Sequence, residues 1–202
     1  MRMVWVRHGE TLWNRENRLQ GCSDIALSET GEQQARQLAR NLTEQPDYIF
    51  VSPLKRTQAF AAPLAARFAL TPHVHQDLCE MSFGRWEGLR YEDMDAKMQK
   101  QYAAWSIDPV ANCPPGGEEA AVFARRVKRF LQKMAGELNE TDTVAVVTHG
   151  GVIRVAVTLA MQMPAVAAAR IKIATASATV LEYYPDNWYL DKLNDTCHLF
   201  KQ

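Results

Sequence analysis

Two histidine–glycine pairs follow apolar runs that are typical of buried strands. His8-Gly9 comes after the run at 3–6, and His149-Gly150 comes after the run at 144–147. In an open α/β sheet, binding sites form at the carboxyl ends of the strands, so we expect both imidazoles at one edge. A glycine beside each histidine lets the backbone approach a ligand closely. The helix expected to open at Gly150 adds free N–H groups and a positive dipole end, which suit an anion.

Two arginines supply the charge that would hold such an anion. Arg7 directly precedes His8, and Arg56 lies in the first turn of a helix expected over 55–68. A guanidinium presents paired N–H donors that match phosphate oxygens. An Arg-His-Gly-Glu tetrad alone can arise by chance, and His149 alone can be a core histidine at a strand end. The conjunction of three strand ends favours a phosphate pocket.

Glu80 is the candidate proton donor for a leaving oxygen. It lies in the segment 78–84 among mostly apolar neighbours. A positioned carboxyl group can give a proton to a leaving alcohol and take one from water. The alternative is an ordinary surface glutamate at the start of a loop.

Alternating strand-like and helix-like segments must position these residues. The pattern predicts an α/β fold with a largely parallel sheet. Strands are expected at 3–6, 48–51, 73–75, 144–147, 177–184 and 188–193, with a hairpin turn at 185–187. Helices are expected after an N-cap at Ser28, and over 55–68, 123–138 and 152–161.

Residues 81–117 interrupt this alternation. Four large side chains recur there at helical spacing, before a Pro-Pro-Gly-Gly turn at 114–117: Met94, Met98, Tyr102 and Trp105. The segment is interpreted as a helical insertion over one end of the sheet, within a single domain of 202 residues. Its apolar side chains either form a small core of their own or provide a wall for an organic leaving group.

The composition argues against several classes of function. Lys and Arg total 23 and Asp and Glu total 23, so no global basic field draws nucleic acid or an anionic membrane. The apolar runs fall short of the roughly 20 residues of a spanning helix, and the N-terminal run is too short for a signal peptide. We therefore expect a cytoplasmic protein. The C-terminal strands offer an edge at which a homodimer could form.

The cysteines give no sign of a metal site. Cys22, Cys79, Cys113 and Cys197 contain no C-x-x-C pair and are widely spaced. Structural zinc sites normally show close paired ligands, so we interpret the four as free thiols in a reducing compartment. Neither a metal nor another cofactor is expected.

Together the motifs resemble the histidine phosphatase superfamily, in its phosphoglycerate-mutase-like branch, over most of the chain. The matching segments are 7–11, 13–14, 18–21, 30–35, 52–57, 80–88, 115–118 and 148–151. Ala26 stands where the family commonly has proline. The resemblance implies a three-layer fold with helices on both faces of the sheet and the insertion 81–117 over the active site.

The resemblance also implies a role for each matched residue. His8 would be the nucleophile that takes the phosphoryl group. Glu80 would protonate the leaving alcohol and then deprotonate the attacking water. The remaining residues would hold the phosphoryl oxygens, by the side chains of Arg7, Arg56, His149, Asn14 and Gln20 and by the backbone of Gly21 and Gly150. No metal is required in this scheme, because the arginines neutralise the charge.

The segment 80–88 and the Pro-Pro-Gly-Gly-Glu run at 114–118 resemble α-ribazole 5′-phosphate phosphatases. This similarity implies a small-molecule phosphomonoester as substrate and a place in cobalamin biosynthesis. One alternative is a phosphoglycerate-mutase-like or broad-specificity phosphatase acting on small sugar or glycerate phosphates. Another is a non-catalytic phosphate-binding module, which the presence of His8 and Glu80 disfavours.

Overall fold

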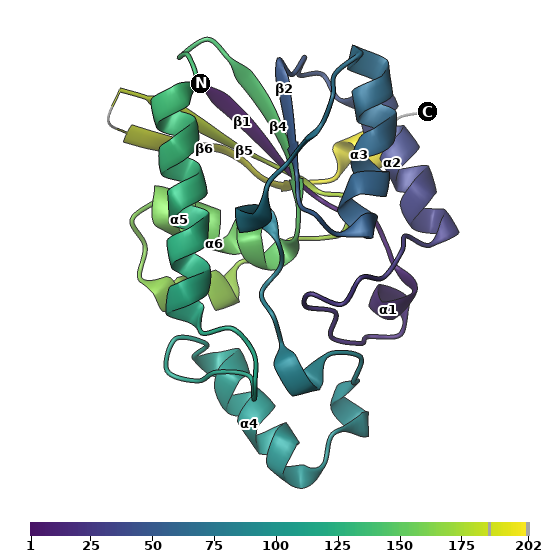
Figure 1. Cartoon of the computed structure of the whole chain (residues 1–202), viewed down its shortest axis with the longest axis vertical. Helices are drawn as coiled ribbons and strands as arrows, with labels where there is room; N and C mark the ends of the chain where they lie inside the picture. The colour runs from purple at the N-terminus through teal and green to yellow at the C-terminus, as the bar shows by residue number, and fades with distance from the viewer. Residues whose placement is uncertain (186, 201–202) are drawn as a thin grey trace.

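A six-stranded sheet in the order β3-β2-β4-β1-β5-β6 forms the centre of the computed structural model (Figure 1). The structure describes residues 1–185 and 187–200. The strands are β1 (Arg2–Arg7), β2 (Tyr48–Val51), β3 (His73–Val74), β4 (Thr143–Thr148), β5 (Ala178–Tyr184) and β6 (Asn187–Asp195). The pairs β3–β2, β2–β4 and β4–β1 are parallel, whereas β5 and β6 are antiparallel to their neighbours. The predicted largely parallel sheet is confirmed.

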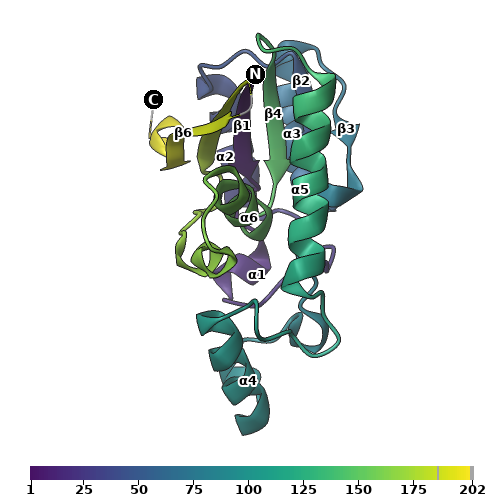
Figure 2. The same ribbon diagram turned by 90° about the vertical axis from the view of Figure 1, so that its left-hand side faces the viewer.

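Helices cover both faces of this sheet (Figure 2). One face carries α2 (Glu29–Asn41) and α3 (Lys55–Phe68), and the other carries α5 (Ala120–Glu137) and α6 (Gly150–Ala160). Side chains alternate across a strand, so Trp5 joins the α5–α6 core and Val6 joins the α2–α3 core. The predicted three-layer arrangement is therefore confirmed.

The ends of the helices follow the local sequence. Ser28 caps α2, because its hydroxyl accepts a hydrogen bond from the N–H of Gly31, as predicted. Helix α6 begins at Gly150, where the sequence predicts the helix to open. In the predicted hairpin at 185–187, Asp186 lies outside the described residues, while Tyr184 and Asn187 on either side are paired.

The segment 81–117 lies beyond the carboxyl ends of the parallel strands (Figure 1). It contains two short 3-10 helices, η2 (Gly84–Trp86) and η3 (Tyr91–Asp93), and then α4 (Ala96–Ile107). The helix begins after Asp95, which caps it, so Met94 lies before the helix rather than in it. We call residues 81–117 the cap segment.

Aromatic rings hold the cap segment together. The ring of Trp105 lies 5.4 Å from that of Phe83 and 5.8 Å from that of Trp86, and Trp86 lies 5.6 Å from Tyr102. These are the distances of edge-to-face aromatic packing. The insertion thus has a small core of its own, which is the first of the two sequence interpretations.

Four shorter elements complete the chain near the site and the C-terminus. Helix α1 (Leu12–Arg15) follows β1, and the 3-10 helices η1 (Gln76–Leu78), η4 (Ala165–Arg170) and η5 (Cys197–Leu199) lie in connections. Within residues 1–185 and 187–200, none of the helices is long and apolar enough to cross a lipid bilayer.

Candidate active site

A cavity of about 210 Å³ lies at the carboxyl ends of β1 and β4, beside the cap segment. It is lined by Arg7, His8, Asn14, Arg18, Leu19, Gln20, Gly21, Arg56, Glu80, Met81, Phe83, Trp105, Phe123, Gly150, Gly151 and Arg154. Strands β1 and β4 are parallel neighbours with Arg7 opposite Thr148, and the N–H of His8 donates to the carbonyl of Thr148 at 2.9 Å. This register brings the two histidine–glycine pairs to one edge of the sheet.

His8 is held with one ring nitrogen free of protons. Its Nδ1 lies 2.7 Å from the carbonyl oxygen of Gly9. A carbonyl can only accept, so Nδ1 carries the proton and Nε2 keeps its lone pair. Burial, together with the nearby cations of Arg7 and Arg56, holds the pKa of His8 well below its usual range. The ring is thus a neutral nucleophile over a wide range of pH.

Arg7 and Arg56 flank His8 and are anchored by backbone carbonyls. Arg7 Nη1 donates to Ile173 at 2.6 Å, and Arg56 Nη2 donates to Gly21 at 2.7 Å. The Nε atoms of both arginines are buried without a hydrogen-bond partner among the described residues. Burial lowers the pKa of both guanidiniums, that of Arg7 to about 10. Both remain charged near neutral pH, and their unused donors suit the oxygens of an anion.

His149 packs against His8. Its ring is fully buried, it lies 5.2 Å from the ring of His8, and it does not line the cavity. Its Nε2 lies 2.7 Å from the hydroxyl oxygen of Ser52, while Nδ1 is buried and finds no partner in the part of the chain described. Burial and then the charge of Arg56 hold the pKa of His149 well below its usual range. The structure therefore puts a second neutral imidazole beside His8.

Glu80 faces the amino end of α6. Its Oε2 accepts a hydrogen bond from the N–H of Gly151 at 3.0 Å, and its Oε1 accepts one from the N–H of Met81 at 3.0 Å. Arg126 of α5 donates to the carbonyl of Glu80 at 2.9 Å and so fixes the backbone. A Cβ at Gly151 would lie 2.3 Å from Glu80 Oε1, so a larger residue here would displace the carboxylate.

The polar rim comes from α1 and the loop after it. The side-chain oxygen of Asn14 accepts from the N–H of Thr11 at 3.0 Å, which leaves its NH₂ group to face a ligand. Gln20 is nearly buried, and its Oε1 has no partner within 1–185 and 187–200. Gly21 adopts a φ of +53°, a conformation that glycine takes most readily.

One carboxylate ties this loop to the cap segment. Oε1 of Glu87 accepts hydrogen bonds from the N–H groups of Cys22 at 3.1 Å and Phe83 at 3.0 Å. Its Oε2 accepts from the hydroxyl of Ser23 at 2.6 Å. Glu87 therefore sets the distance between the loop that carries Gly21 and the segment that carries Glu80.

Sequence reasoning missed three contributors to the site. Ser52 holds His149, Gly151 holds Glu80, and Arg154 lines the cavity with its Nε buried and unpartnered among the described residues. Arg154 could have been found, because it lies four residues after Gly150 and therefore on the same face of α6. Ser52 lies in the matching segment 52–57, but the resemblance implies no role for its hydroxyl group.

Part of the cavity wall is apolar. It is formed by Met81, Phe83, Trp105 and Phe123. Of the four residues that recur at helical spacing in the cap segment, only Trp105 reaches the cavity. The second sequence interpretation, a wall for an organic group, thus applies to part of the cap segment.

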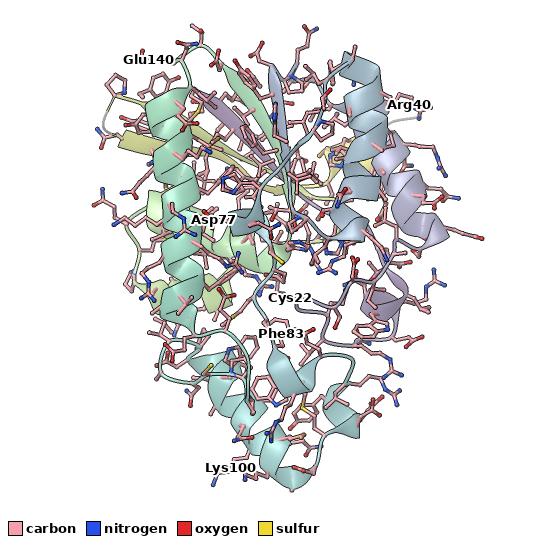
Figure 3. The ribbon with its side chains drawn as sticks, in the orientation of Figure 1. Cys22, Arg40, Asp77, Phe83, Lys100 and Glu140 are labelled. Carbon is pink, nitrogen blue, oxygen red and sulfur yellow. The ribbon has the colours of Figure 1, made fainter. Side chains whose placement is uncertain are left out.

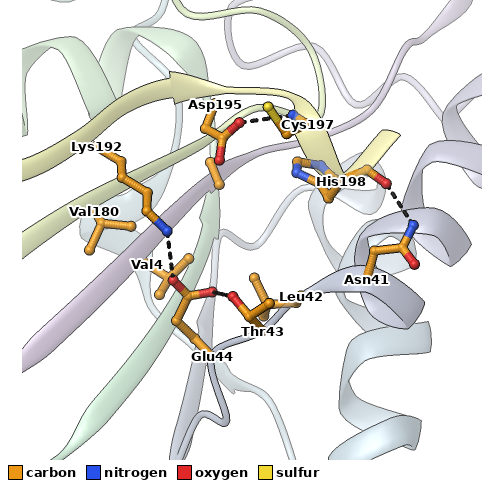
Figure 4. Close-up of a pocket in the computed structure, with 11 residues that line it drawn as sticks. Val4, Asn41, Leu42, Thr43, Glu44, Val180, Lys192, Asp195, Cys197 and His198 are labelled. Carbon is orange, nitrogen blue, oxygen red and sulfur yellow. Dashed lines mark hydrogen bonds and ion pairs between the residues drawn. The ribbon is translucent and has the colours of Figure 1, made fainter. Parts of the chain in front are cut away.

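A second cavity of similar size lies between the end of α2 and strands β5 and β6 (Figure 4). Glu44 and Lys192 form an ion pair of 3.4 Å across it, and Asn41 donates to the carbonyl of His198 at 2.7 Å. The site residues predicted from the sequence all lie elsewhere, so this cavity is not the candidate site.

The groups at the candidate site suit transfer of a phosphoryl group. An imidazole lone pair, two guanidiniums and a carboxylate surround one cavity. The lone pair can attack phosphorus, and the guanidiniums can stabilise the charge on the phosphoryl oxygens.

Comparison with known proteins is consistent with this chemistry. The family model described as "Histidine phosphatase superfamily (branch 1)" matches residues 3–196. The chain is 33% identical over 202 residues to phosphoglycerate mutase-like protein 4 of Arabidopsis thaliana, covering 98% of this chain and 86% of that one. It is 32% identical over 200 residues to phosphoserine phosphatase 1 of Hydrogenobacter thermophilus, covering 98% and 94%. It is 32% identical over 166 residues to the adenosylcobalamin/alpha-ribazole phosphatase of Salmonella typhimurium, covering 82% of each.

Solved structures are similar over nearly the whole chain. A mycobacterial glucosyl-3-phosphoglycerate phosphatase superposes with a TM-score of 0.89 at 32% identity, covering 96% of this chain and 99% of that one. The alpha-ribazole phosphatase from Shigella flexneri superposes with a TM-score of 0.87 at 28% identity, covering 96% of each chain. Proteins with different substrates therefore share this architecture.

Proposed function

We propose that this chain, which belongs to the histidine phosphatase superfamily and is a phosphatase, hydrolyses phosphomonoesters through a phosphohistidine at His8. The observation that carries this proposal is the hydrogen bond from Nδ1 of His8 to the carbonyl of Gly9, at 2.7 Å. That bond leaves the lone pair on Nε2, in a buried ring between Arg7 and Arg56.

The reaction has two halves. In the first, Nε2 of His8 attacks phosphorus, the bond from phosphorus to the leaving oxygen breaks, and Glu80 gives its proton to that oxygen. In the second, Glu80 takes a proton from water, the water oxygen attacks phosphorus, and the bond to His8 breaks. Phosphate and the free alcohol are the products, and His8 and Glu80 return to their initial states.

The phosphoryl oxygens lie against the groups that the cavity offers. Arg7 and Arg56 bind them with their unused donors, and the NH₂ groups of Asn14 and Gln20 and the amide of Gly150 complete the cradle. The backbone of Gly21 contributes by holding Arg56. We assign His149, held by Ser52, to the phosphoryl side of His8. The guanidiniums supply the charge neutralisation, so we expect activity without added metal in the presence of EDTA.

For the substrate we propose α-ribazole 5′-phosphate, in cobalamin biosynthesis. The support is the apolar wall of Phe83, Trp105, Met81 and Phe123, on which a flat aromatic leaving group can pack. The similarity to the Salmonella adenosylcobalamin/alpha-ribazole phosphatase points the same way.

A second candidate substrate class is small sugar or glycerate phosphates. Arg154 favours it, because this guanidinium lines the cavity and its Nε is buried without a partner in the described chain. A carboxylate on the leaving group would pair with it. The phosphoserine and glucosyl-3-phosphoglycerate phosphatases among the similar proteins are named for substrates of this kind.

Phosphate release from α-ribazole 5′-phosphate, 3-phosphoglycerate and phenyl phosphate, each with EDTA, tests the proposal. A kcat/KM for the ribazole about 100-fold above the others, or about 2.7 kcal/mol of selective binding in the transition state, would support the first substrate. A preference for 3-phosphoglycerate would support the second. Loss of all activity with EDTA would contradict the metal-free mechanism.

We also propose that residues 1–202 form one domain with 81–117 as its cap, that the protein is cytoplasmic, and that two copies pair along β6. Strand β6 pairs with β5 on one side and is last in the sheet order, so its outer edge can add a strand. Light scattering would test the dimer, and a monomer at micromolar concentration would contradict it. Limited proteolysis would test the domain.

A further inference from the structure

Cys22 and Cys79 lie on two separate loops beside the candidate site. Their sulfur atoms are 3.8 Å apart, and both side chains are half-buried. Cys22 follows Gly21, whose carbonyl anchors Arg56, and Cys79 precedes Glu80. Figure 3 shows Cys22 between the sheet and the cap segment, to which Phe83 belongs. Neither sulfur takes part in the proposed phosphoryl transfer.

We propose that Cys22 and Cys79 are an oxidation site at which a reversible disulfide arrests the phosphatase. The inference depends on phosphatase activity and on no particular substrate. A disulfide needs its sulfur atoms about 2.05 Å apart, so the two loops must approach by less than 2 Å. The hydrogen bonds of Glu87 to the N–H groups of Cys22 and Phe83 already hold these loops together.

The surroundings shift the pKa values of the two thiols in opposite directions. The contact with the Cys22 sulfur, and then the guanidiniums of Arg126 and Arg56, lower the pKa of the Cys79 thiol. The same sulfur–sulfur contact and burial raise the pKa of the Cys22 thiol. Cys79 is therefore the sulfur that becomes a thiolate first and attacks an oxidant, and Cys22 is the sulfur that resolves the product.

With hydrogen peroxide as the oxidant, the reaction balances. The Cys79 thiolate attacks one peroxide oxygen, the O–O bond breaks, and the hydroxide that leaves takes up a proton to form water. The Cys79 sulfur is then a sulfenic acid. The Cys22 sulfur attacks it, the S–O bond breaks, and a second water leaves with the proton of the Cys22 thiol. Two thiols have lost two hydrogens, and the peroxide has been reduced to two waters. A dithiol reductant reverses the change.

Formation of this disulfide would disturb both the support of Arg56 and the position of Glu80. It draws the backbone of Gly21, which supports Arg56, toward the backbone of Glu80. It also removes the hydrogen bond that the Cys22 thiol donates to the carbonyl of Glu80 at 3.2 Å. Misplacing a reacting group by about 1 Å can cost on the order of 100-fold in rate, so we expect a loss of that order in kcat/KM for phenyl phosphate.

The test uses the purified full chain, titrated with hydrogen peroxide, quenched by alkylation and digested for mass spectrometry. We expect a linked peptide pair that contains Cys22 and Cys79, and activity that falls as it forms and returns with dithiothreitol. Cys113→Ser is the matched control, because Cys113 is exposed and does not line the cavity. It should keep the full response, whereas Cys22→Ser and Cys79→Ser should lose the linked peptide.

Several results would overturn the proposal. The first is that no Cys22–Cys79 peptide forms under conditions that already oxidise Cys113. The second is that this peptide forms without a change in kcat/KM. The third is that Cys22→Ser is reversibly inactivated to the same extent as the wild-type chain. The linked peptide is detected in the wild-type chain, so the test remains valid even if a variant folds poorly. It is also independent of substrate choice, because a wrong substrate assignment leaves the linked peptide unaffected.

Discussion

The contact between Gly151 and Glu80 gives the most specific prediction. The variant Gly151→Ala adds a Cβ that would lie 2.3 Å from Oε1 of Glu80, where 3.4 Å is the onset of ordinary contact. Alanine keeps the N–H that binds Oε2, and it favours the helical backbone, so the fold should be retained. The carboxylate must therefore shift by about 1 Å from its present position.

The size of the effect depends on how much the leaving group needs a proton. A displacement of about 1 Å costs on the order of 100-fold in rate where the displaced group acts, or about 2.7 kcal/mol. We expect that loss in kcat/KM for an alkyl phosphate, whose alkoxide is a poor leaving group. With 4-nitrophenyl phosphate, whose phenolate leaves without a proton, the loss should be less than about tenfold.

Gly136→Ala is the matched control, because a Cβ at Gly136 meets nothing within 4 Å. It should leave both rates unchanged. An equal loss for both substrates in Gly151→Ala would show that the variant disturbs phosphate binding rather than proton transfer. No loss for the alkyl phosphate would remove Glu80 from the role of acid.

Three further predictions rest on the same site. Glu80→Gln should slow alkyl phosphates by about 100-fold or more and 4-nitrophenyl phosphate far less, and a uniform effect in steady-state assays would contradict this. Arg154→Gln should raise KM for 3-phosphoglycerate and leave KM for phenyl phosphate nearly unchanged, whereas equal changes would assign Arg154 to the phosphoryl group. The buried neutral rings of His8 and His149 have folded-state pKa values well below about 6.5, so the unfolded chain binds more protons in acid. The free energy of unfolding should therefore fall as pH drops below about 6.5, approaching about 1.4 kcal/mol per pH unit for each histidine. In urea unfolding, His149→Gln should reduce the pH dependence of the free energy of unfolding by up to about 1.4 kcal/mol per pH unit. An unchanged pH dependence would contradict the neutral, buried state of His149.

The sequence predicts which segments meet at the site, because the site lies at the ends of strands. Apolar runs define β1 and β4, and a parallel sheet brings their carboxyl ends together. Hence the meeting of His8 and His149 at one edge follows from their places directly after those runs. The cap of α2 at Ser28 follows equally from local preference.

Contacts between loops cannot be predicted in this way. The approach of Cys22 to Cys79 depends on the left-handed backbone of Gly21 and on the hydrogen bonds of Glu87, which join segments distant in sequence. The orientation of the His149 ring likewise depends on Ser52, which no periodicity singles out. Such positions are set by tertiary packing, so only the structure shows them.

Hydrolysis through a covalent bond to His8 is the central claim. The most direct test is rapid quenching of the enzyme with a radiolabelled phosphomonoester, followed by peptide mapping under alkaline conditions that preserve phosphohistidine. We expect label on the peptide that contains His8, lost on acid treatment and absent in His8→Ala, with no turnover by that variant. Turnover by His8→Ala, or label on a different residue, would contradict it.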